Sequence, residues 1–143
     1  MPETGATEAD EREIVRIIHS IFDGFMNRDI DAMNASMSPD GTVWDVFQSK
    51  LYRGGKDRRE FQEGDIEQSA KRGPLTLHIE EPVIDFWDDT ALARYYLTYE
   101  YQPPNAAAGH VRITDVFRRI DGKWWRMHHH EGTVPTGIPP LDE

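Results

Sequence analysis

The sequence predicts an α+β fold in which N-terminal helices cover one face of a curved antiparallel β-sheet. Three observations predict it. Apolar residues recur at helical spacing between residues 14 and 25, long β-rich runs begin at residue 75, and a tight turn at Asp121-Gly122 joins the last two of them. Because helices precede the strands rather than alternate with them, the expected layout places the helices together on one sheet face. A cavity between the two layers is the expected result.

The 143 residues suit one domain with a substantial core, and 38% hydrophobic residues with 10% aromatics are ordinary for a globular protein. We expect a flexible N-terminal tail over residues 1–7, a single domain over residues 8–135 and a C-terminal tail over residues 136–143. No apolar run approaches the roughly 18 residues of a membrane span, and the acidic start is unlike a signal peptide. A cytoplasmic protein is therefore expected.

The chain has no cysteine, which excludes disulfides, thiol catalysis and thiolate metal sites. Its formal charge of -10 repels phosphate backbones and anionic lipid surfaces. We therefore expect neither a nucleic acid nor a membrane as partner, but a small hydrophobic or aromatic molecule.

Helical signals dominate the first half of the chain. Residues 8–28 carry apolar side chains at three- and four-residue steps, which predicts an amphipathic helix with Thr7 as its N-cap. A short second helix is predicted over residues 30–37, ended by a Ser-Pro-Asp-Gly turn. A third, over residues 56–71, has only a thin apolar side and ends before a Gly-Pro pair.

β-Rich runs follow each other in the second half. A short run at residues 42–47 precedes the third helix, and two long runs cover residues 75–87 and 91–102. In the later run the two-residue period of a strand puts Tyr95, Tyr99 and Tyr101 on one face. A loop of small residues then leads into the last hairpin.

That hairpin, residues 110–132, brings a carboxylate and several imidazoles together. Asp-Gly tolerates the positive φ angles of a two-residue turn, and this turn sets the pairing of the two strands. Asp115 then lies directly opposite His128, with Cβ atoms about 4.5–5.5 Å apart. His130 shares that face and His129 points outward. A β-bulge near the turn would shift the register and undo this pair.

The order of elements resembles the nuclear transport factor 2-like superfamily, which includes SnoaL-like cyclases, scytalone dehydratase and ketosteroid isomerase. The resemblance covers about residues 11–135. The segment DGKWWRMHHHEGTVP is similar to the closing strand of many SnoaL-like domains and of the calcium/calmodulin-dependent kinase association domain. The resemblance to this superfamily implies a cone-shaped, cystatin-like roll.

A narrower similarity is to ketosteroid isomerase. SPDGTVWDVF places Asp45 where that enzyme carries its general base, and DVFR places Asp115 where it carries an aspartate that donates a hydrogen bond to the substrate oxyanion. TYEYQ is similar to its pocket-lining strand, which implies that Tyr99 and Tyr101 face the cavity. The isomerase's oxyanion tyrosine would fall near Ile21 and is absent.

The residues themselves support acid–base chemistry. Asp45 lies between apolar neighbours, where desolvation raises a carboxyl pKa and makes a general base, although an aspartate beside a turn often only binds nearby amides. Asp115 is either a protonated donor or an ionised partner that orients His128, which is then the alternative base. A purely structural Asp–His hydrogen bond is the simpler alternative.

Further residues are expected to contact substrate through aromatic surface or a polar tip, with a plain core position as the alternative for the rings. They are Tyr95, Tyr99, Tyr101, Arg126, His130, Phe117 and Trp44. No metal and no other cofactor is expected, because one hairpin rarely converges three ligands and the resembled superfamily implies none.

The leading hypothesis is a cofactor-independent lyase or isomerase that moves a proton on a small aromatic or polycyclic substrate. The reaction would be double-bond isomerisation, dehydration or a retro-aldol-type loss of a fragment such as formaldehyde. The alternative is a non-catalytic ligand-binding or oligomerisation domain, with outward Val116, Trp125 and Met127 at the seam. An apolar outer face predicts a homodimer or higher homo-oligomer in either case.

Overall fold

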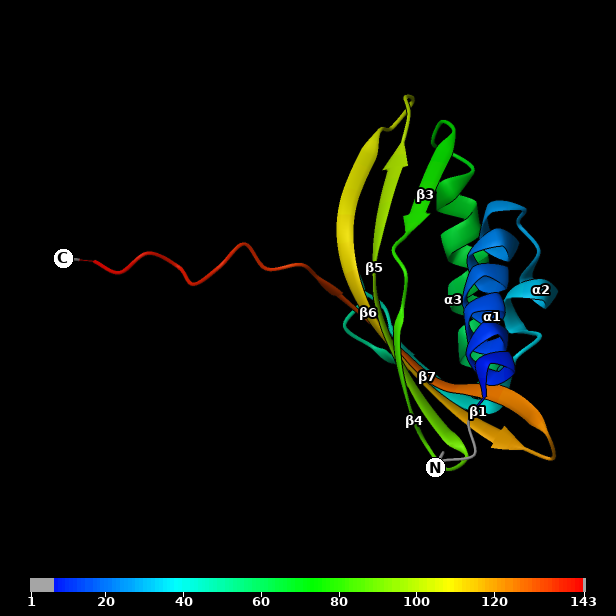
Figure 1. Ribbon diagram of the computed structural model, residues 1–143. Coiled ribbons are helices and arrows are strands. Elements are labelled where there is room, and N and C mark those ends of the chain that lie inside the picture. The colour runs from blue at the N-terminus through cyan, green and yellow to red at the C-terminus, as the bar shows by residue number, and fades with distance from the viewer. Residues whose placement is uncertain (1–6, 143) are drawn as a thin grey trace.

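The computed structural model describes residues 7–142, and its first helix, α1 (Glu8–Met26), begins at the expected cap (Figure 1). The Thr7 hydroxyl accepts a hydrogen bond from the Asp10 amide at 3.1 Å, and the Asp10 carboxylate accepts one from the Thr7 amide at 3.0 Å. This capping box satisfies amides that have no partner inside the helix. The helices α2 (Ile30–Asn34) and α3 (Gly54–Ser69) follow.

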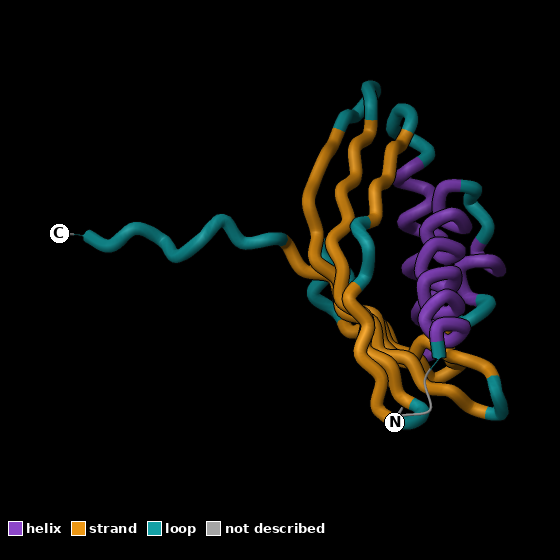
Figure 2. Tube along the Cα trace, viewed as in Figure 1, coloured by secondary structure: helices purple, strands orange, loops and turns teal. Residues whose placement is uncertain are grey.

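The strands form one strongly bent sheet, and the described helices lie on its concave side (Figures 1 and 2). The strand order is β2-β1-β7-β6-β5-β3, β4 also pairs with β5, and only the β1–β7 pairing is parallel. The strands are β1 (Met37–Trp44), β2 (Leu51–Arg53), β3 (Leu75–Ile79), β4 (Val83–Trp87), β5 (Thr90–Tyr101), β6 (Ala107–Ile120) and β7 (Lys123–Thr133). The predicted α+β fold with a curved, mostly antiparallel sheet is confirmed.

The main core lies between α1 and the concave face of β5, β6 and β7. Ile14, Ile17 and Ile18 of α1 are completely buried, as their helical spacing predicts. The strands add Ala91, Ala93, Tyr95, Leu97, Val111, Ile113, Phe117 and Trp124 to the same cluster. Packing of these apolar side chains fixes α1 against the sheet and leaves α3 beside it as the second wall of a cavity.

Several element boundaries differ from the prediction. The helix expected over residues 30–37 is shorter, because β1 already begins at Met37. The segment expected as a turn, residues 38–41, lies inside β1, where a shift in the pairing with β7 accommodates it. The run expected over residues 75–87 is two strands, β3 and β4, because Pro82 between them has no amide to donate to a ladder.

The two ends of the chain lie apart from this body. The predicted N-terminal tail falls outside the described residues except for Thr7, which caps α1. Residues 134–142 form no helix or strand and project from the sheet on the side away from the helices (Figure 1). None of the helices described has the length and apolar character to span a membrane.

Candidate functional site

The pairing of β6 with β7 decides which histidine meets Asp115. The Asp121-Gly122 turn forms as predicted, with φ of 51° and 79° at its two residues. Met127 is then an extra residue on β7, a β-bulge, so that Asp115 pairs with His129. The predicted pair of Asp115 with His128 is therefore wrong. The bulge moves every residue after it to the opposite face of the sheet.

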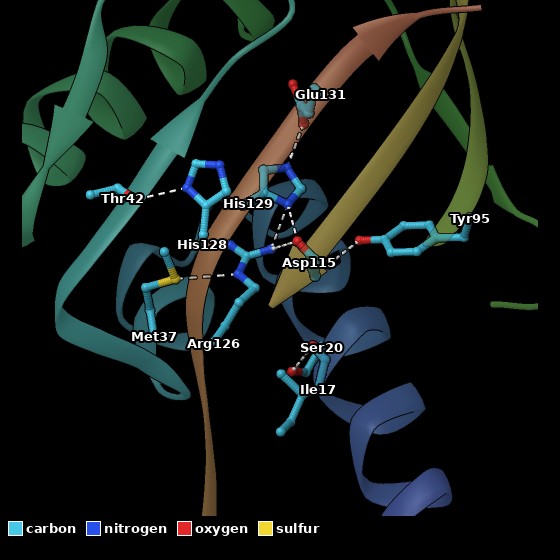
Figure 3. A network of polar contacts seen from close by, with 10 residues as sticks. All are labelled: Ile17, Ser20, Met37, Thr42, Tyr95, Asp115, Arg126, His128, His129 and Glu131. Atoms are coloured by element: carbon cyan, nitrogen blue, oxygen red, sulfur yellow. Dashed lines mark hydrogen bonds and ion pairs between the residues drawn. The ribbon is translucent and has the colours of Figure 1, made fainter. Parts of the chain in front are cut away.

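The bulge turns two of the three consecutive histidines away from the helices. His128 and His130 lie on the convex face beside Thr42 and Trp44 of β1. The Nδ1 of His128 is 2.7 Å from the Thr42 hydroxyl, and the Trp44 ring lies 5.8 Å and 5.2 Å from the two imidazoles. Figure 3 shows His128 pointing to Thr42 while His129 points the other way. Neither outward histidine reaches the concave side, contrary to the prediction.

His129 instead lies at the centre of a buried network, with 5% of its surface exposed (Figure 3). Its Nδ1 donates to Asp115 Oδ1 at 2.5 Å and its Nε2 donates to Glu131 Oε2 at 2.9 Å. The Tyr95 hydroxyl donates to the second oxygen of Asp115 at 2.6 Å, and Arg126 Nη1 lies 3.5 Å from the first. Every polar atom of this completely buried aspartate therefore has a partner.

The charges in this network support one another. Burial alone would raise the pKa of Asp115, but the positive charges of His129 and Arg126 hold it below its usual value. Burial alone would lower the pKa of His129, but the Asp115 charge and the hydrogen bonds to both carboxylates raise it to about 8. His129 is therefore an imidazolium near pH 7. Arg126 Nη1 lies 2.9 Å from His129 Nδ1, and the two cations are held together by the Asp115 carboxylate that they share.

A cavity of about 800 Å³ opens between the end of α1, α3 and the concave face of the sheet. Of the residues predicted to meet a substrate, Asp45, Tyr99, Tyr101 and Arg126 line it. His129 and Glu131 also line it, and they connect it to the buried Asp115. The aromatic lining consists of Phe22, Phe25, Phe47, Tyr52, Phe61, Tyr99 and Tyr101. This volume and lining suit a small flat organic molecule.

Three other predicted contacts do not line the cavity. Tyr95 is buried behind it and donates its hydroxyl to Asp115. Phe117, completely buried, belongs to the core. Trp44, 44% exposed, lies on the convex face, because side chains alternate along β1 and its neighbour Val43 is buried toward the cavity. Asp115 itself does not line the cavity, and its contact with the cavity lining runs through His129.

Asp45 lies just past the end of β1, on the cavity side. Burial, a hydrogen bond to Glu131 and the negative charge of Glu131 raise its pKa to about 7. One carboxylate oxygen also accepts the Phe47 amide at 2.8 Å, so the backbone contact expected of an aspartate beside a turn is present as well. Across the cavity on α3, burial and the Glu131 charge raise the pKa of Asp65 to about 6. Glu131 itself stays ionised, because His129 holds its pKa low against the effect of burial.

Sequence reasoning missed His129, Glu131 and Asp65. His129 and Glu131 were missed because they face the cavity only after the bulge at Met127. No residue type in the hairpin predicts that bulge. Asp65 had a usable signal, because with Arg58 and Gln62 it forms a polar stripe along one side of a predicted helix. Within residues 7–142 no three His, Cys, Asp or Glu side chains are arranged to hold a metal ion.

Solved structures with the same fold are numerous. An NTF2-like protein of unknown function from Pseudomonas putida is 22% identical, with a TM-score of 0.79 over 94% of this chain and 100% of that one. An NTF2-like protein with a cystatin-like fold from Novosphingobium aromaticivorans is 16% identical, with a TM-score of 0.79 over 90% and 84%. The association domain of C. elegans CaMKII is 17% identical, with a TM-score of 0.70 over 88% and 97%. These likenesses show the fold.

A search of curated proteins found no match to the chain. The model of the SnoaL-like domain matches residues 14–136, which is most of the sequence. The wider NTF2-like group includes isomerases and dehydratases. The helices on a bent sheet, the cavity between them and this match together identify the chain as a member of the SnoaL-like domain family.

Proposed function

We propose that the protein is a cofactor-independent lyase or isomerase that removes a proton from a small aromatic or polycyclic substrate. One observation carries the proposal: the carboxyl group of Asp45 lines an aromatic cavity and has a pKa of about 7. A general base with a pKa near the working pH combines a useful ionised fraction with good proton affinity. This is the position that the resemblance to ketosteroid isomerase assigned to the base.

The neighbouring groups suit a base that must also return its proton. Glu131 stays ionised beside Asp45 and makes its protonated form stable once it has taken a proton. His129, oriented by Asp115, fixes the position of Glu131. The electron pair of the broken C–H bond moves through the conjugated system to a carbonyl oxygen, and Arg126 or Tyr99 stabilises the resulting enolate. Isomerisation results if the proton returns to another carbon, and elimination if a group leaves.

Hydrogen–deuterium exchange tests the proposal across several substrate classes at once. Steroid enones, hydroxyketones and phenolic diaryl-propanediols are incubated with the protein in deuterated water and followed by mass spectrometry. We expect deuterium uptake or a new mass in at least one class, lower by about 10²–10⁴-fold in Asp45→Asn. Asp40→Asn, at an exposed position of β1, is the matched control and retains activity. Equal exchange by both variants would remove Asp45 as the base.

A second candidate function is a non-catalytic binding or assembly domain. The convex face favours it, because Val83, Trp87 and Tyr96 are exposed there, and Val116, Trp125 and Met127 are partly exposed. The similarity to the CaMKII association domain points the same way. We propose a homodimer or higher homo-oligomer through this face, tested by analytical ultracentrifugation of the wild type and Trp87→Glu. A wild-type monomer at high concentration would contradict it. We also propose a cytoplasmic location.

A further inference from the structure

The buried side of α3 is polar, which is unusual for a helix packed over a sheet. Phe61 also lines the cavity, but a polar row of cavity-lining residues recurs at helical spacing along α3, with Arg58, Gln62, Asp65 and Gln68, and Arg72 follows just past its end. Arg58 is 4% exposed and Gln62 is 5% exposed. Burying polar groups costs free energy unless they find partners, so such a stripe is a poor choice for packing alone. It is the expected composition of a wall that meets a polar ligand.

Arg58 is the member of this stripe whose charge is least balanced. Its Nε donates to Asn34 Oδ1 at 2.9 Å and its Nη1 donates to the Gly41 carbonyl oxygen at 3.2 Å, and both acceptors are neutral. Within residues 7–142 it forms no ion pair with a carboxylate. Burial and the positive charge of Arg126 lower its pKa, yet a guanidinium remains charged near neutral pH.

One end of this guanidinium is available to a ligand. The remaining nitrogen, Nη2, donates to no protein atom in the described part of the chain. Since no buried side-chain nitrogen there lacks a partner, Nη2 is not sealed inside the protein, and Arg58 lines the cavity. Arg126, close enough to lower the pKa of Arg58, also lines the cavity and keeps its own Nη2 free of protein acceptors in the same range.

We propose that Arg58 and Arg126 form an anion subsite in the cavity and that the ligand carries a carboxylate. Guanidinium groups present planar pairs of N–H donors that match the two oxygens of a carboxylate. A single charge is favoured over a phosphate dianion because Arg126 is already paired with Asp115, so that only Arg58 lacks a counter-charge. Resting on the proposed function, the substrate is then a small aromatic acid with its carboxylate at this arginine pair and its reacting carbon near Asp45.

Equilibrium binding of matched probes tests the subsite directly. Isothermal titration compares 3-phenylpropanoate with its uncharged amide, 3-phenylpropanamide, because the two differ chiefly in charge. We expect the wild type to bind the acid at least about tenfold more tightly than the amide. Equal affinity for the two probes, or binding of neither at millimolar concentrations, would overturn the proposal. This comparison needs no variant and so holds even if substitutions at Arg58 impair folding.

Variants then locate the preference. Arg58→Gln should reduce the preference for the acid to about onefold to twofold, while the adjacent Arg59→Gln should leave it unchanged. Arg59 is the matched control because it is exposed and pairs with Asp31 on the surface. Circular dichroism confirms that each variant is folded. A folded Arg58→Gln protein that still prefers the acid as strongly as wild type would refute the role of Arg58.

Asp45→Asn separates this inference from the proposed function. The variant should lose exchange activity but keep its preference for the acid. Preference for the acid without any deuterium exchange by the wild type would support the subsite and reject the enzyme. Deuterium exchange on neutral substrates by a wild type that shows no preference for the acid would support the enzyme and reject the subsite.

Discussion

Asp115 and Asp45 belong to two regions of the same site, and their surroundings shift the pKa of the aspartate side chain in opposite directions. Asp115 is completely buried, yet its pKa lies below the usual value because His129 and Arg126 surround it with positive charge. Asp45 is less buried and lines the cavity, and its pKa is raised to about 7 because burial and the negative charge of Glu131 act in the same direction. The sign of the neighbouring charge, rather than the depth of burial, decides which aspartate stays ionised.

The two regions therefore differ in how they could contribute to the site, the Asp115 region by positioning a side chain and the Asp45 region by meeting a ligand. The Asp115 region is a closed set of hydrogen bonds that holds His129 in one position. The Asp45 region is open to the cavity and holds a carboxyl group near the midpoint of its titration at neutral pH. In the proposed reaction, such a site keeps its proton-transferring group on the ligand side and its charge compensation inside the sheet.

The largest expected effect comes from Asp115→Asn. The substitution removes the carboxylate that His129 and Arg126 share, and Glu131 then balances the charge of His129 by itself, so we expect the free energy of unfolding to fall by about 3–5 kcal/mol. Urea denaturation at neutral pH measures it. The exposed Asp40→Asn should change the same quantity by less than about 0.5 kcal/mol. Similar losses in the two variants would show that the buried charges do not depend on Asp115.

The pH dependence of stability tests the partner of Asp115. The pKa of His129 is raised from 6.5 to about 8 in the folded protein, so its contribution is fully present below pH 6.5 and lost as the pH rises through about 8. The loss is on the order of 2 kcal/mol. Denaturation of the wild type and His129→Gln across this range should show a clearly larger decline in the wild type than in the variant. An equal decline in the variant would assign it to another group.

Asp45→Asn should stabilise the protein, which is the opposite of the effect at Asp115. The pKa of Asp45 rises on folding, so the stability present below pH 3.8 is lost as the pH rises to about 7. The variant has no such loss. Its melting temperature should therefore exceed that of the wild type by an amount that grows across this range and then levels off. A constant difference between the two proteins would mean that Asp45 has an ordinary pKa.

The smallest effect is expected for His128→Ala. His128 faces away from the cavity and its polar partner is the Thr42 hydroxyl, so exchange activity should stay within about twofold of wild type. His129→Gln, one residue later on the inner face, should reduce it far more. Loss of exchange in His128→Ala with activity kept in His129→Gln would reverse the assignment of inner and outer histidines.

Predictions from the sequence were accurate where the signal is local or periodic. The isoleucines of α1 reach the core at the predicted spacing, the Asp121-Gly122 turn forms, and Tyr99 and Tyr101 share the cavity face. These results depend on neighbours a few residues away. Helical and strand periods encode such neighbours directly in the order of residues.

The placement of the candidate site depended on tertiary structure. The bulge at Met127 exchanges His128 for His129 as the partner of Asp115, and β-bulges respond to how strands twist and pack rather than to one residue type. The pKa of Asp45 depends on Glu131, which lies on another strand. The sequence by itself determined the layers, the last turn and the core face of the first helix. Only the folded sheet decided which charges meet, because electrostatic partners are set by distance in space.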